Sequence, residues 1–201
     1  MKMITLALMM IGLTGLLSSQ STPADLTKPF PQTAFQAKRI AERSVPPTVV
    51  NNVLQIYGER NKLTIAPRTW KILFWDPSAE QNVRSVTVTD DRVVEVKAGY
   101  VELDKLRLAA YKMDETIIAG SLMVDSNQAL EKVRATMQLQ NITLSSVEYW
   151  LKKEKDHTYA SWKLILYVAQ GGEEVELGHA SISAQTGELL ECVLKRDKTL
   201  Q

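Results

Sequence analysis

The chain contains two similar hexapeptides, and this internal repeat constrains the fold more than any other feature. The sequence Trp-Lys-Ile-Leu-Phe-Trp at residues 70–75 is matched by Trp-Lys-Leu-Ile-Leu-Tyr at residues 162–167. Each hexapeptide is followed by two further strand-like runs with a polar turn between them, at residues 90–91 in the first copy and 185–188 in the second. A repeat of this kind indicates a duplicated structural unit.

A helix is expected before the first set of strands. Thr33 and Gln36 have the spacing of a capping box at the start of an apolar helical face. Pro46-Pro47 ends this helix and can open another. The next apolar residues recur at three- and four-residue spacing, which predicts a second helix that ends at Gly58: Val49, Val50, Val53, Leu54 and Tyr57.

The remaining apolar segments alternate with polar residues or are β-branched, and they predict antiparallel strands. In the first copy we expect a three-stranded meander, at residues 68–76, 84–89 and 92–97. In the second copy we expect a helix capped by Asp125 and Gln128. The strands that follow it are predicted at residues 142–153, 162–169, 178–184 and 189–194.

The order of a helix before an antiparallel sheet predicts the α+β class. We therefore expect two tandem units, at residues 33–98 and 121–196, each with a helix packed on an antiparallel sheet. Residues 99–120 are expected to link the units, with a short helix between Leu103 and Met113. The sequence leaves open whether the units form separate domains or one continuous sheet.

The N-terminus is typical of a secretory signal peptide. Lys2 supplies a positive charge, and Ile4 to Leu17 is an apolar run without charge. This run is shorter than the roughly twenty residues of a membrane span, and the small residues after it predict cleavage after Ala24. We therefore expect residues 1–24 to be removed and the protein to be exported, to the periplasm or the extracellular space, without a stable membrane span. A cleavage site near Ser19 and an uncleaved N-terminal anchor are the alternatives.

Charge and cysteine content limit the classes of partner and of fold. The formal net charge of +1 gives no electrostatic basis for binding nucleic acid. The single cysteine, Cys192, excludes an intramolecular disulfide bond. It alternates with Leu190 and Leu194, so we expect it to point into a core.

No catalytic residue, metal site or cofactor is predicted. Two histidines and one cysteine, without close spacing, do not fit a zinc site. The chain has no Gly-x-Ser-x-Gly elbow, phosphate loop or His-Glu-x-x-His helix. The carboxylate pairs at 90–91 and 173–174 fall in predicted turns, and we assign them no acid–base role.

The repeated strands have two apolar faces. Trp70 and Trp162 occupy equivalent positions and are expected in the core beneath the helices. The opposite face also needs a cover, because it is too apolar to be left in water. It is the candidate partner-binding face: Leu73, Trp75, Ile165 and Tyr167. We expect the two copies to cover these residues by packing on each other, and a bound partner is the alternative.

The second copy resembles a PepSY-type domain. The likeness is carried by residues 125–130, by the Trp-Lys-Leu of 162–164, and by residues 182–190 with their Thr-Gly-Glu turn. This resemblance implies a cystatin-like unit in which a helix packs on an antiparallel sheet and Gly187 permits the last turn. The first copy departs from the pattern, with Asp90-Asp91 in place of a glycine turn and a second helix. The family carries no catalytic residues to transfer, so the resemblance implies binding or inhibition.

These expectations together favour an exported, non-catalytic binding or regulatory protein. Its expected partner is a secreted protein, such as a peptidase or a cell-wall hydrolase, which it would restrain. The alternative is a carrier of a small apolar ligand or lipid, because cystatin-like sheets can enclose an apolar pocket. An enzyme of unrecognised type is the third hypothesis.

Overall fold

The computed structural model describes residues 33–99, 109–154 and 158–195. The predicted signal peptide, residues 1–24, lies outside these residues, as does most of the predicted linker helix. In the described part of the chain, no helix is both long and apolar enough to cross a membrane.

The order of elements is a helix followed by four strands, twice over. The first set comprises α1 (Ala34–Glu42), β1 (Val53–Gly58), β2 (Thr69–Trp75), β3 (Val83–Thr89) and β4 (Arg92–Ala98). The second set comprises α2 (Ser126–Arg134), β5 (Ser146–Lys153), β6 (Ala160–Gln170), β7 (Glu173–Ser183) and β8 (Leu189–Leu194). Short 3₁₀ helices occur at η1 (Glu80–Asn82), η3 (Met113–Glu115) and η4 (Ala119–Ser121). The predicted α+β class is confirmed.

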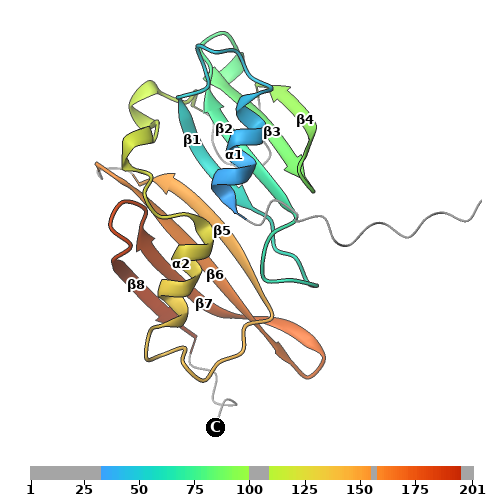
Figure 1. Cartoon of the computed structure of the whole chain (residues 1–201), viewed down its shortest axis with the longest axis vertical. Coiled ribbons are helices and arrows are strands. Elements are labelled where there is room, and N and C mark those ends of the chain that lie inside the picture. The colour runs from blue at the N-terminus through green and yellow to red at the C-terminus, as the bar shows by residue number, and fades with distance from the viewer. Residues whose placement is uncertain (1–32, 100–108, 155–157, 196–201) are drawn as a thin grey trace, which may run out of the picture.

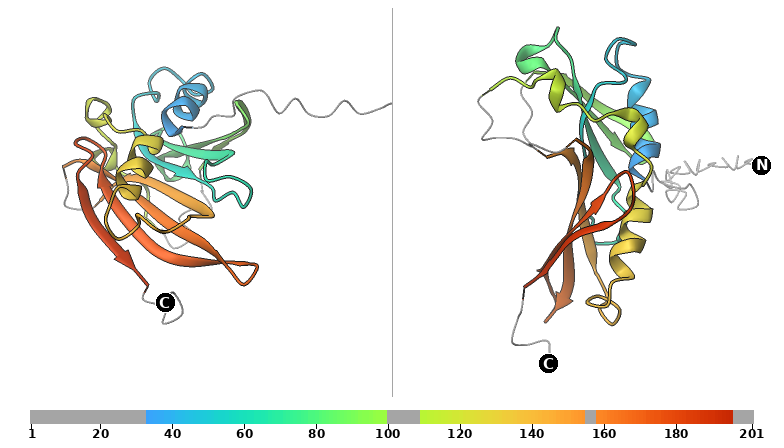
Figure 2. Two further views of the ribbon diagram at one scale, coloured as in Figure 1. Left: turned by 60° about the horizontal axis from the view of Figure 1, so that its bottom comes forward. Right: turned by 90° about the vertical axis from the view of Figure 1, so that its left-hand side faces the viewer.

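All eight strands form one antiparallel sheet, in the order β4-β3-β2-β1-β5-β6-β7-β8. β1 and β5 pair at its centre, so the two sets of four strands join into a continuous sheet rather than forming two separate sheets (Figure 1). Both α-helices lie on the same face of this sheet (Figure 2). We call the face without an α-helix the open face, and the β1–β5 pairing the seam.

The prediction of a second helix in the first copy is wrong. Residues 47–51 form turns, and Val53–Gly58 forms strand β1. β1 pairs with β2 along one edge and with β5 along the other, so its backbone hydrogen-bonding groups have partners on both sides. Its β-branched and aromatic residues suit this central position, which outweighs their helix-like spacing. The first copy therefore contributes four strands rather than the expected three.

The N-termini of the two helices meet above the sheet. The predicted capping box of α2 is confirmed: the Asp125 side chain accepts from the start of the helix, and the Asp125 backbone N–H donates to Gln128 at 2.9 Å. The same Asp125 carboxylate accepts from the backbone N–H of Phe35 at 3.1 Å. Ser126 Oγ accepts from the N–H of Ala34 at 3.0 Å. Residues at the start of α2 therefore supply hydrogen-bond acceptors to α1 as well.

Three of the aromatic rings in the core beneath the helices pack against one another. Trp70 and Trp162 are fully buried, as predicted. Tyr149 of β5 lies between them, with ring centroids 5.7 Å from Trp70 and 6.4 Å from Trp162. Gly58, predicted to stop a helix, instead makes room for this packing: a Cβ there would lie 2.6 Å from the Trp70 ring. The core is therefore continuous across the seam.

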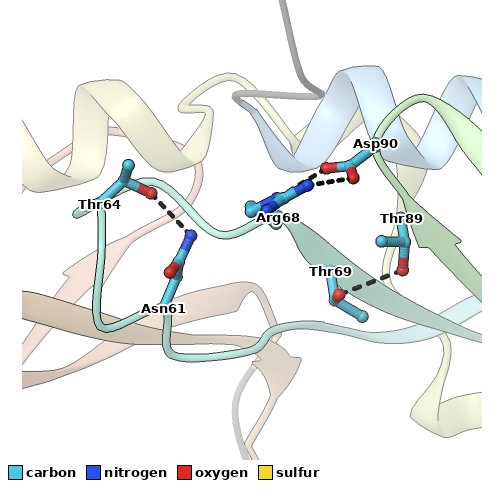
Figure 3. Close-up of polar contacts among 6 residues, drawn as sticks. All are labelled: Asn61, Thr64, Arg68, Thr69, Thr89 and Asp90. Atoms are coloured by element: carbon cyan, nitrogen blue, oxygen red, sulfur yellow. Dashed lines mark hydrogen bonds and ion pairs between the residues drawn. The ribbon is translucent and has the colours of Figure 1, made fainter. Parts of the chain in front are cut away.

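The turn between β3 and β4 is tied to the start of β2 (Figure 3). Asp90 and Asp91 have φ angles of 48° and 65°, a region that favours glycine. Arg68 donates two hydrogen bonds to the Asp90 carboxylate, at 3.0 Å from Nε and 2.5 Å from Nη2. The hydroxyls of Thr69 and Thr89 lie 3.1 Å apart beside this pair. Side-chain contacts thus support a turn made without glycine.

Candidate functional site

One row of paired residues crosses the whole open face and is nearly palindromic in residue type. From β4 to β8 it comprises Glu95, Thr87, Lys71, Tyr57, Trp150, Lys163, Ser181 and Glu191. The order is a carboxylate, a hydroxyl, a lysine and an aromatic ring, followed by the same types in reverse. Lys71 and Lys163 are the second residues of the two hexapeptides. The sequence repeat therefore reappears as an approximate two-fold arrangement of side chains about the seam.

Tyr57 and Trp150 form the centre of this row. Their ring centroids lie 4.4 Å apart, with planes inclined by 47°, and both side chains are partly exposed. The Trp150 indole N–H donates to Glu148 Oε1 at 2.5 Å. Glu148 is two residues away on β5, so its side chain projects from the same face. The seam thus carries an aromatic pair with a carboxylate oriented beside it.

The loop after β1 adds a cation from the first half to the second half. The Arg60 guanidinium lies 4.3 Å from the centroid of the Tyr167 ring on β6. Its Nε is 3.9 Å from Glu174 Oε2 on β7, a long ion pair. We call the residues gathered here the open-face cluster: Tyr57, Arg60, Glu148, Trp150, Tyr167 and Glu174.

The two tyrosines of the open-face cluster stay protonated at neutral pH. Burial raises the pKa of Tyr57, and the negative charge of Glu148 raises it further. The same two causes, in the same order, raise the pKa of Tyr167. Both phenols are therefore neutral hydrogen-bond donors near a charged carboxylate.

Glu174 is held charged by several weak contacts. Its carboxylate oxygens are covered by neighbouring atoms. Its pKa is nevertheless lowered, first by the nearby Ser146 hydroxyl and, against the opposing effect of burial, by Ser145 and Arg60. Neither serine hydroxyl reaches the geometry of a full hydrogen bond, and the ion pair with Arg60 is long. No single strong partner accounts for the lowered pKa.

Two of the four predicted face residues are covered by the chain itself. Leu73 is fully buried in a small cluster with Leu54, Val83 and Tyr111, against which Trp75 packs. The Trp75 indole N–H donates to the Tyr111 carbonyl oxygen at 3.3 Å. The segment around Tyr111 therefore covers this part of the open face, in place of the expected face-to-face packing of the two copies.

The other two predicted face residues lie on β6, beyond the seam. Ile165 and Tyr167 are partly buried, and the structure brings Tyr167 into the open-face cluster. It does not bring them beside Leu73 and Trp75, because β1 and β5 lie between β2 and β6. The candidate partner face is thus divided into a covered end and a more accessible end.

The sequence prediction missed five members of the open-face cluster, all except Tyr167. Glu174 was expected in a turn, whereas it lies in β7. Tyr57 was missed because a helix was predicted where strand β1 forms. Glu148 and Trp150 could have been found from the alternation of β5, which buries Val147, Tyr149 and Leu151 on the other face. The placement of Arg60 on Tyr167 has no sequence signal, because the two residues belong to different halves of the chain.

The described residues contain no group of three or more His, Cys, Asp and Glu side chains that could hold a metal ion. His179 Nε2 lies 3.4 Å from Glu191 Oε2 on the neighbouring strand. Cys192 packs partly buried against the core, and burial raises the pKa of its thiol. His157 lies outside the described residues.

Comparison with known proteins adds no relative: no family model, curated protein or solved structure matches the chain. The PepSY-type resemblance of the second copy therefore stays a prediction based on residues 125–130, 162–164 and 182–190.

Proposed function

We propose that this chain is an exported, non-catalytic protein that binds a secreted protein partner through its open face. The proposed partner is a peptidase or a cell-wall hydrolase, which the binding restrains. We also propose that the two halves are tandem PepSY-like units derived from one duplicated unit. The palindromic row across the sheet supports this origin, because it relates the two halves strand by strand.

The observation that carries the proposal is the open-face cluster itself. Tyr57 and Trp150 are partly exposed at the centre of the open face, which neither α-helix of the described residues covers (Figure 2). Partly exposed Trp, Tyr and Arg side chains are the residue types that dominate protein–protein binding energy. Paired strands set the positions of Tyr57 and Trp150, so this part of the surface is organised before a partner arrives.

The alternative, a carrier of a small apolar ligand, is less favoured by the packing. A cystatin-like sheet would hold such a ligand between its helices and its strands. In this protein that layer holds the fully buried side chains of Trp70, Phe74 and Trp162. The open face therefore offers the better-supported binding surface.

Isolation of the protein from its native exported fraction tests this proposal. The wild-type chain should co-purify with a hydrolase whose activity falls as the protein is added back. Trp150→Ala should lose that partner, whereas Tyr159→Ala, which removes an aromatic residue 49% exposed immediately before β6, should retain it. Co-purification of a small apolar molecule instead of a protein would favour the carrier. N-terminal sequencing of the same material should place the mature terminus between Ser19 and Leu26.

A further inference from the structure

We propose that Glu148, together with the rings of Tyr57, Trp150 and Tyr167, binds a single lysine or arginine side chain of the partner protein. The inference rests on the proposed function, because it names the chemistry by which the open face recognises that partner. The four side chains come from β1, β5 and β6, the strands at and beside the seam.

Glu148 forms no ion pair within the described part of the chain, although Lys163 lies on the neighbouring strand and Arg60 acts on the same two phenols. Its polar contact there is the Trp150 indole N–H, at 2.5 Å from Oε1. This hydrogen bond orients the carboxylate and leaves Oε2 without a hydrogen bond among the described residues. A partly exposed, oriented carboxylate of this kind has capacity for a charged donor.

Aromatic rings flank this carboxylate. Trp150 holds Glu148 by its hydrogen bond and packs against Tyr57 at 4.4 Å. The charge of Glu148 raises the pKa of both Tyr57 and Tyr167, so the carboxylate lies near both phenols, as the Arg60 guanidinium does. Ring faces attract cations through their quadrupole, most strongly for tryptophan and tyrosine. A carboxylate among such rings therefore favours a cationic group over a neutral apolar one.

Arg60 shows that this surface accepts a cation. Its guanidinium lies over the Tyr167 ring at 4.3 Å and pairs with Glu174 at 3.9 Å. Glu174 thus receives from the chain itself both a charge partner and a neighbouring aromatic face. Glu148 lies near the same rings but forms no ion pair among the described residues, and a partner side chain would supply one.

The charges around the cluster are mixed. Glu59, Glu148 and Glu174 lie there together with Arg60 and Lys62 from the loop after β1. Lys71 and Lys163 lie beside Tyr57 and Trp150 on the neighbouring strands. These lysines would repel a ligand with several clustered positive charges, so an isolated lysine or arginine fits best.

A titration of the full chain with short capped peptides tests the site. The probes are acetyl-Ala-Lys-Ala-amide, its arginine counterpart, and an isosteric peptide with norleucine in place of lysine. The readout is the ¹H–¹⁵N indole signal of Trp150, assigned by its loss in Trp150→Phe. We expect the lysine and arginine peptides to shift this signal with saturation in roughly the millimolar range, and the norleucine peptide to leave it unmoved.

Two carboxylate variants separate a specific site from general charge. Glu148→Gln should weaken binding of the lysine peptide at least about tenfold, while the other indole signals and the melting temperature stay unchanged. Glu191→Gln, at the outer end of the same face, should bind as the wild type does. An equal shift with norleucine, no saturable shift at all, or unchanged binding by Glu148→Gln would each overturn the inference.

The native co-purification distinguishes this inference from the proposed function. If Glu148→Gln keeps the partner that Trp150→Ala loses, open-face binding stands and the cation site is wrong. If Glu148→Gln and Trp150→Ala both lose the partner and Glu191→Gln keeps it, then open-face binding and the cation site are both supported. If all three keep it, the open face is not the docking surface.

Discussion

Oδ1 of Asp125 lies 3.1 Å from the backbone nitrogen of Phe35 and 2.6 Å from that of Ser126, so one carboxylate serves the N-termini of both α-helices. At this point the two helices bring together backbone N–H groups that have no partner within their own helix, and the positive ends of both helix dipoles. A single anionic side chain therefore joins the helix of one half to the helix of the other.

Asp125→Ala should lower the free energy of unfolding by about 2–3 kcal/mol, because it removes a cap and a second backbone hydrogen bond together. Urea denaturation measures the change. Asn127→Ala, at an exposed position in the first turn of α2, should stay within about 0.5 kcal/mol of wild type. An equal effect of the two variants would show that the shared cap contributes nothing.

Gly58→Ala should destabilise the protein by about 1–3 kcal/mol through overpacking. The added Cβ would lie 2.6 Å from Trp70 and 2.8 Å from Pro67. Gly120→Ala is the matched control, because a Cβ there meets nothing within 4 Å. Thermal melting of both variants checks the prediction, and a neutral Gly58→Ala would contradict the close packing under Trp70.

Tyr111→Ala should destabilise the protein by about 2–4 kcal/mol, because Tyr111 covers Leu73 and Trp75. Trp75→Ala should have a smaller effect, since its side chain remains partly exposed. A double-mutant cycle should show that the two effects do not add, with a coupling of about 0.5–3 kcal/mol. Additive effects would mean that the two side chains do not stabilise each other.

Asp76→Asn should lower stability at neutral pH by about 1–3 kcal/mol, because Ser78 and Arg84 donate to this buried carboxylate at 2.6–2.9 Å. Burial alone would raise the pKa of Asp76, but the hydrogen bonds from Ser78 and Arg84 together lower it. A lowered folded-state pKa stabilises the protein above the unfolded pKa of about 3.9, and that stability is lost as pH falls through the folded value.

The gap in stability between wild type and Asp76→Asn should therefore shrink as the pH drops below about 4. Chemical denaturation at several pH values measures it. Asp114→Asn, at an exposed position, provides the control and should show no such gap at any pH. A gap that stays constant down to low pH would show that the charge of Asp76 is not what stabilises the fold.

Asp91→Gly should raise stability by about 0.5 kcal/mol, because Asp91 has a φ of 65° and glycine adopts this region without a Cβ clash. Asp91→Ala should have the opposite effect, since alanine tolerates the left-handed region less well than aspartate does. Melting temperatures of the two variants should therefore move in opposite directions. Asp90 is left intact in both, which preserves its contacts with Arg68.

Local patterns predicted the elements whose stabilising contacts lie within a few residues. Asp125 and Gln128 are three residues apart, and their capping box forms as the spacing indicates. The alternation in β5 puts Val147, Tyr149 and Leu151 on one face, which the structure buries, and the repeated hexapeptides placed Trp70 and Trp162 in the core. These features follow from periodicity and short-range hydrogen bonds, which any stretch of sequence displays by itself.

Only the tertiary structure decided the features that join the two halves. β1 is a strand because β2 and β5 pair with both of its edges, and β5 is about ninety residues further along the chain. For the same reason, the contacts of Arg60 with Tyr167 and of Asp125 with Phe35 cannot be predicted from the sequence around these residues. The sequence by itself determined the α+β class and the repeat. Strand pairing, which depends on backbone edges that all sequences share, decided that the repeat forms one sheet and brings the open-face cluster together.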